Sequence, residues 1–167
     1  MHILQQPQGK KGNIMKTNKT GLIAILLWAG LILVLGIRFV KGSTEKTADG
    51  RTAIIITDSE KTMILGEMRQ LLQAVQGVVN GLDKNDAKAI TDAALGGGTA
   101  IMIDHNPELM MKLPLEFKGQ GIAVHKYFDK IGEEAKNGAK KEKILSMLNT
   151  QLQNCIACHA AYQFKTK

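Results

Sequence analysis

Apolar and polar residues follow two different patterns along this chain of 167 residues. The first pattern is an apolar run at residues 21–40, in which Arg38 is the only charged residue. Twenty helical residues span about 30 Å, the thickness of a bilayer's hydrocarbon core, and Arg38 lies close enough to the end to reach the headgroups. We predict a transmembrane anchor at residues 21–40. A cleaved signal sequence is the alternative, but the run is longer than a usual signal core and no small-residue cleavage site follows it.

The second pattern is a three- and four-residue spacing of apolar positions, which predicts four amphipathic helices after residue 56. The first helix opens at Thr57 and Glu60, which can form a capping box. The second begins near Asp83 and runs to about residue 102, with a bend at the glycines 96–98. Residues 106–121 hold two of the three prolines and two glycines and are interpreted as a structured connection. The third helix covers about residues 122–135 and the fourth about residues 141–164. The apolar face of the first helix is predicted to carry Leu65, Met68, Leu72, Val75, Val79 and Leu82. The corresponding face of the fourth helix is predicted to carry Leu145, Leu148, Leu152, Cys155, His159 and Tyr162.

The fold class follows from these helices. Residues 41–56 are interpreted as a linker, because they begin with a polar stretch that has glycine at both ends. Ile54, Ile55 and Ile56 are β-branched, but the run is too short and isolated to form a sheet. We therefore predict an all-α fold, in which residues 57–167 form an antiparallel up-down four-helix bundle. One transmembrane helix and a basic tail at residues 1–20 precede it, and Met15 is a candidate for the true start of translation.

Positive charge is concentrated beside the apolar run. The formal net charge is +7, but six of the basic residues precede residue 42, and the remainder of the chain has 16 Lys and Arg against 15 Asp and Glu. The basic character therefore belongs to the flanks of the membrane segment. It does not indicate a nucleic-acid-binding face.

The only two cysteines lie in the sequence Cys155-Ile156-Ala157-Cys158-His159. Cys-x-x-Cys-His is the attachment sequence for a c-type haem: both thiols form thioethers, and the histidine is the proximal iron ligand. A thioredoxin-like redox pair would follow a strand, a structural zinc site would need four spaced ligands, and a disulfide fits this helical spacing poorly. The motif predicts one covalent haem. Because such haem is attached outside the cytoplasm, the segment after residue 40 should face the periplasm.

The position of this motif on the last of four helices resembles the cytochrome c′ and cytochrome c-556 family. The resemblance covers roughly residues 57–165 and is based on the stretch NCIACHAAY (154–162), the stretch KTMILGEM (61–68) and the order of the helices. It implies that Met68 is the sixth iron ligand, whereas the spacing alone favours a core methionine. It also places Lys61 near the haem propionates and allows a homodimer. The family often has a basic residue at the position of Gln163.

Other candidates for the sixth ligand are weaker. Met63 lies off the apolar face that carries Met68. His125 could also reach the iron, and His105 is a more remote option, although a lone histidine on a helix is more often a hydrogen-bonded group.

Two functions are compatible with these residues. The first is a periplasmic electron carrier, without enzymatic activity, that is anchored in the bacterial inner membrane beside its redox partner proteins. The second is a five-coordinate haem protein that binds nitric oxide or carbon monoxide, in which Met68 packs without binding iron. If the apolar run is cleaved, the protein would be soluble in the periplasm.

Overall fold

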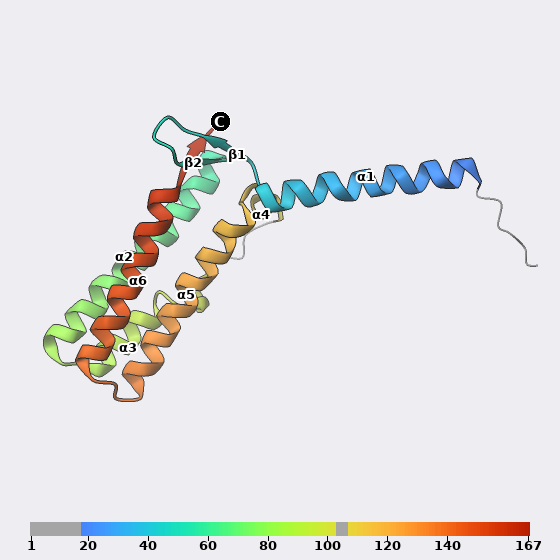
Figure 1. Cartoon of the computed structure of the whole chain (residues 1–167). Coiled ribbons are helices and arrows are strands. Elements are labelled where there is room, and N and C mark those ends of the chain that lie inside the picture. Colours follow the sequence, from blue (N-terminus) through green and yellow to red (C-terminus); the bar gives the residue numbers. More distant parts are fainter. Residues whose placement is uncertain (1–17, 103–106) are drawn as a thin grey trace, which may run out of the picture. The chain divides into compact units, whose positions relative to one another are not determined.

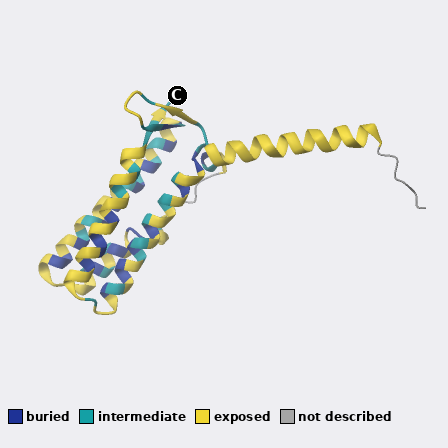
Figure 2. Ribbon diagram, in the orientation of Figure 1, coloured by how far each residue is buried: buried dark blue, intermediate teal, exposed yellow. Residues whose placement is uncertain are grey.

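The apolar run forms one long helix, α1 (Lys19–Lys41). The computed structural model describes residues 18–102 and 107–167, so Met15, His105 and most of the basic tail lie outside the described residues. By length and composition α1 could cross a membrane or be a signal sequence, and its side chains are exposed (Figure 2). The chain forms two structural units, residues 1–34 and 35–167. The elements that follow α1 all belong to the second unit.

Two strands of a three-stranded sheet occupy the region where we predicted a linker, and the third strand comes from the C-terminal end of the predicted fourth helix. β1 (Thr44–Lys46) and β2 (Thr52–Ile56) pair antiparallel, and β3 (Tyr162–Thr166) pairs parallel with the other edge of β2. The chain is mostly helical as predicted, but the sheet shows that the strictly all-α prediction is wrong. The short strand β2 forms because both of its edges are paired and its side chains at Ala53, Ile54 and Ile56 are buried.

The hairpin loop between β1 and β2 depends on Asp49 and Gly50. Gly50 has a φ of 86°, in the left-handed region that favours glycine. The Asp49 carboxylate accepts hydrogen bonds from the Thr47 hydroxyl at 2.5 Å and from the Arg51 amide at 3.2 Å. An Asp-Gly pair between two strands is a strong hairpin signal, and the linker interpretation overlooked it.

The first of the predicted helices is confirmed as α2 (Asp58–Lys84). The capping box forms as expected: the Glu60 amide donates to Thr57 Oγ1 at 3.3 Å, and the Thr57 amide donates to Glu60 Oε2 at 2.7 Å. The helix ends at Asn85, whose backbone is left-handed with a φ of 52°. An N-cap at Asp86 then starts the next helix, α3 (Ala87–Leu95).

The second predicted helix ends earlier than expected, at the glycines 96–98. α3 (Ala87–Leu95) stops there, and a 3-10 turn (Thr99–Ile101) follows. A Cβ at Gly97 would lie 2.7 Å from the Ala74 Cβ and 3.1 Å from the Phe128 ring. The glycines therefore mark a helix end that packs closely against α2 and the helix of Phe128; they do not bend a continuous helix.

Three further helices complete the second unit: α4 (Pro107–Lys112), α5 (Leu115–Lys136) and α6 (Lys141–Ala161). α5 begins directly after Pro114, well before the predicted residue 122. α6 ends before the predicted residue 164, because Tyr162 adopts an extended backbone and enters β3. Among the described helices, α2 contacts α3, α3 contacts α5 and α5 contacts α6, with weaker contacts between α2 and α6 (Figure 1).

The buried faces of α2 and α6 are rotated from the predicted ones. Leu72 is 68% exposed and Leu145 is 55% exposed, although both were predicted to be buried. Polar residues occupy part of the inward faces: Glu67 on α2 and Gln151 on α6 are buried, and Gln151 Nε2 donates to the Val124 carbonyl at 3.0 Å. A pattern that counts only apolar residues misses such positions. The apolar residues that α2 and α6 bury are Ile64, Leu71, Ala74, Val78, Leu82, Ile144, Met147 and Leu148.

Candidate functional site

A pocket of about 260 Å³ lies where α2, α5, α6 and the sheet meet. Its lining is mostly apolar and includes Cys155, Cys158 and His159 from α6 together with Met68 from α2. The four residues that the sequence singled out thus line one pocket. Their roles in haem binding stay predictions, but a single group bound in this pocket could contact all four side chains.

The helical repeat of α6 explains the arrangement of the motif. Cys155, Cys158 and His159 occupy positions i, i+3 and i+4 within the last two turns, so they share one side of the helix. Both thiols are partly buried, whereas His159 is exposed. A group attached at this side would contact both thiols and the imidazole at once.

The two thiols are partly buried, and this burial favours their uncharged form. Both are free cysteines, and burial raises the pKa of Cys155 and of Cys158, the latter also through the charge of Cys155. A reactive thiol in a redox enzyme has the opposite property, a lowered pKa. No group of three or more His, Cys, Asp or Glu within residues 18–102 and 107–167 could hold a metal ion directly.

Met68 contributes the only thioether among the residues that line the pocket. It is partly buried and also packs against the main hydrophobic core, next to Leu71 on the same helix. Met63 packs instead against the second core cluster, beneath the sheet, and does not line the pocket. Of the two methionines on α2 that the sequence offered, only Met68 is placed to contact a bound group.

His125 lines the same pocket, but both of its ring nitrogens already have protein partners. The side chain is 3% exposed; Nδ1 lies 2.9 Å from the Gly97 carbonyl oxygen and Nε2 lies 3.0 Å from Glu67 Oε1. Burial lowers the pKa of His125, but the hydrogen bonds to Glu67 and Gly97 outweigh it and the pKa is raised overall. Because both ring nitrogens already face hydrogen-bond acceptors, neither is directed at a group in the pocket.

The sequence reasoning placed Tyr162 on the same face as the motif, but it missed Phe117 and Phe164, which also line the pocket. Tyr162 and Phe164 come from β3, and Phe117 comes from α5, where we predicted a connection. Their rings pack edge to face, with centroids 5.3 Å apart for Phe117 and Tyr162 and 5.7 Å apart for Phe117 and Phe164. Burial, followed by the nearby Glu116 carboxylate, raises the pKa of Tyr162. No local pattern identified Phe117 and Phe164 as neighbours of the motif, because they come from distant segments of the chain.

Arg51, Gln120 and Gln163 are further polar residues that line the pocket. Gln120 Oε1 is a buried oxygen without a hydrogen-bond partner in the described part of the chain. Arg51 reaches the pocket from the start of β2. The overlooked Asp-Gly signal could have predicted the hairpin that carries Arg51, but its place beside the last helix depends on the pairing of β2 with β3.

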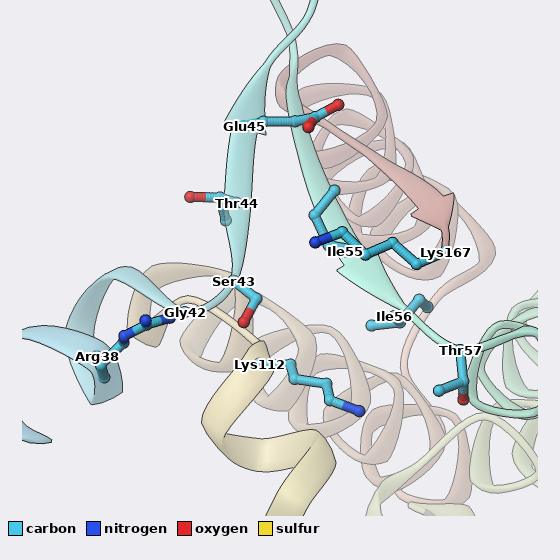
Figure 3. Close-up of a pocket in the computed structure, with 10 residues that line it drawn as sticks. All are labelled: Arg38, Gly42, Ser43, Thr44, Glu45, Ile55, Ile56, Thr57, Lys112 and Lys167. Carbon is cyan, nitrogen blue, oxygen red and sulfur yellow. The ribbon is translucent and has the colours of Figure 1, made fainter.

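A second pocket, of about 460 Å³, lies at the base of the hairpin (Figure 3). Its lining includes Arg38, Lys112 and Lys167, but none of the motif residues. The Lys112 ammonium is already bound, at 2.9 Å from Glu60 Oε1 and 2.8 Å from Glu108 Oε1. These ion pairs tie α4 to α2, so we interpret Lys112 as structural.

No protein-family model, curated protein or solved structure matches this chain. The assignment of a function therefore depends on the pocket and its chemistry.

Proposed function

We propose that the protein is a membrane-anchored c-type cytochrome that carries single electrons in the periplasm. The observation that carries the proposal is the convergence of two thiols, one imidazole and one thioether on a single apolar pocket. Cys155 and Cys158 would hold the haem through thioethers, His159 would bind one axial side of the iron, and Met68 would bind the other. When bound, haem supplies a one-electron couple between Fe(III) and Fe(II).

The pocket fits such a group in its chemistry. Its lining is mostly apolar, as expected for a site that takes up a macrocycle. Its enclosed volume of about 260 Å³ is slightly below the ~300–1,000 Å³ of typical ligand sites. A haem would therefore extend beyond the enclosed part, which is useful for electron transfer to a partner. Gln120 Oε1, the orphaned acceptor, offers one polar contact to a bound group.

The surrounding helices support the family that the motif suggested. α2, α3, α5 and α6 contact one another in sequence, and the motif is on the last of them. We infer that they act as the four-helix bundle of a cytochrome c′ or c-556 type protein, with the sheet as an addition at the end that holds the pocket. In this interpretation α1 is the anchor that keeps the carrier at the inner membrane, close to its redox partners.

The test is to express the full chain in a host that attaches haem to cytochromes. We expect a pyridine haemochrome spectrum of c type, one haem per chain, and a fraction that is extracted from membranes only by detergent. A colourless protein with both thiols open to alkylation would contradict the proposal. A coloured protein released without detergent would contradict only the anchor.

The packing of Met68 against the core favours a second function, that of a five-coordinate haem protein which binds nitric oxide or carbon monoxide. The Met68→Ala variant separates the two. For the electron carrier, we expect the variant to lose the sulfur-to-iron charge-transfer band of the oxidised protein and to gain prompt binding of carbon monoxide. Its reduction potential should fall by an amount on the order of 0.1 V, a fraction of the ~0.8 V range that axial ligands control.

The matched control for this prediction is Met63→Ala, which removes a thioether from the same helix outside the pocket. We expect its spectrum and potential to equal those of the unmodified protein. A high-spin spectrum that already responds to carbon monoxide before any substitution would establish the five-coordinate alternative.

A further inference from the structure

Arg51 is held in place at the pocket by a network that begins in the hairpin loop. Its Nε lies 2.8 Å and its Nη2 2.7 Å from Asp49 Oδ2. Nη2 also donates to Gln163 Oε1, on β3, at 2.9 Å. Asp49 in turn accepts from Thr47, whose hydroxyl also donates to the Arg51 carbonyl at 2.8 Å. The guanidinium is therefore fixed from the hairpin loop and from β3 before any ligand binds.

The charge of Asp49 strengthens this network. Hydrogen bonds from Thr47 and then Arg51 lower the pKa of Asp49 to about 2, so the carboxylate stays charged at every pH of interest. Arginine presents five N–H donors in a planar fork that matches a carboxylate. Asp49 and Gln163 occupy donors on Nε and Nη2, whereas Nη1 has no partner in the described residues. Arg51 thus retains free donors while it lines the pocket.

We propose that Arg51 is the binding site for a carboxylate of the group that occupies this pocket, a haem propionate. The inference rests on the proposed function, because it takes the occupant to be haem. It assigns to the hairpin a role in ligand binding that Lys61 was expected to have: Lys61 is absent from the lining of the pocket, and Arg51 is part of it.

The position of Arg51 also has an electrostatic consequence. The reduced haem carries one negative charge more than the oxidised haem, so a fixed cation beside it stabilises the reduced form. The charge of Asp49 opposes this effect, but Asp49 lies on the loop and is not among the residues that line the pocket. Removal of the guanidinium would also leave the negative charge of Asp49 without its cationic partner, which would destabilise the reduced haem further. Arg51 therefore raises the reduction potential.

The experiment compares Arg51→Gln with Lys46→Gln in the full-length, haem-loaded protein in detergent. Lys46→Gln is the matched control, because this substitution removes the same charge from the same hairpin. The Lys46 side chain is exposed, donates to Thr52 Oγ1 at 3.1 Å and does not line the pocket. We expect the one-electron equilibrium of Arg51→Gln to shift about tenfold toward the oxidised form, a fall of 59 mV in midpoint potential. Lys46→Gln should shift by a small fraction of this.

A second readout separates contact from charge. The propionate bending bands in the resonance Raman spectrum should change in Arg51→Gln and in Arg51→Lys, since lysine lacks the planar fork. The midpoint potential of Arg51→Lys should nevertheless stay close to that of the unmodified protein, because lysine keeps the positive charge. If Arg51→Gln does not fold, Arg51→Lys serves in its place. Equal potentials and unchanged propionate bands in the Arg51 and Lys46 variants would overturn the inference alone. An unmodified protein without haem would overturn the proposed function and this inference with it.

Discussion

Simultaneous replacement of Cys155 and Cys158 by serine should abolish covalent haem attachment completely. The two thiols are the only cysteines in the chain, and both line the pocket. Without them any haem is held by axial ligands and packing alone, and denaturation releases it. The measurement is haem staining of the denatured protein on a gel, together with its intact mass. We expect the unmodified protein to stain and to carry the mass of one haem, and the double variant to do neither.

The control for this result is Ala157→Ser, which changes an exposed residue between the two thiols and preserves the spacing of the motif. It should be attached to haem as efficiently as the unmodified protein. Each single cysteine variant should retain at most one thioether. A double variant that still carries haem through denaturation would mean that another side chain forms the bond, and the proposed function would need a different attachment site.

His125→Leu should strongly destabilise the second unit. It removes the His125 ring, whose Nε2 lies 3.0 Å from Glu67 Oε1, from its contact with a carboxylate that is only 6% exposed. Breaking a buried pair in this way costs about 3–5 kcal/mol, and the Gly97 carbonyl loses its donor as well. Urea unfolding of the full chain, followed by circular dichroism, measures the difference in the free energy of unfolding.

The same pair predicts the pH dependence of stability. Because the pKa of His125 is raised in the folded protein, its contribution is fully present below the unfolded pKa of about 6.5. The contribution is lost as the pH rises through the folded pKa, so the unmodified protein should lose stability on the alkaline side. His125→Leu should lack this loss. The double variant with Glu67→Gln and His125→Gln removes both charges and should be more stable than His125→Leu; equal stabilities would show that the ion pair is unimportant.

The sequence was most informative where a local pattern determines local structure. The capping box at Thr57 and Glu60 and the Cys-x-x-Cys-His spacing each depend on residues within one or two helical turns, and both lie where they were predicted. Loop residues between helices were less predictable. Pro114 and the two glycines in the first turns of α5 suggested a connection, yet the helix starts at Leu115.

Other features could not be predicted from the sequence for physical reasons. One edge of β2 pairs with β3 from the other end of the chain, a pairing that no local window contains. The burial of Glu67 depends on His125 from another helix, so an apolar count places the wrong face of α2 inward. The polar part of the pocket, with Arg51 and Gln120, depends on both of these long-range arrangements.

The parallel pairing of β2 with β3 also has a consequence for biogenesis. The strand β2 and the residues 162–166 become neighbours, so the sheet cannot close until the chain has been synthesised as far as those residues. Contacts between segments so distant in sequence form late in folding. Until then the part of the pocket lining that β3 supplies, Tyr162 and Phe164, is not in place beside the two thiols. Under the proposed function, this leaves an interval in which a maturation enzyme would meet the cysteines before the pocket is complete.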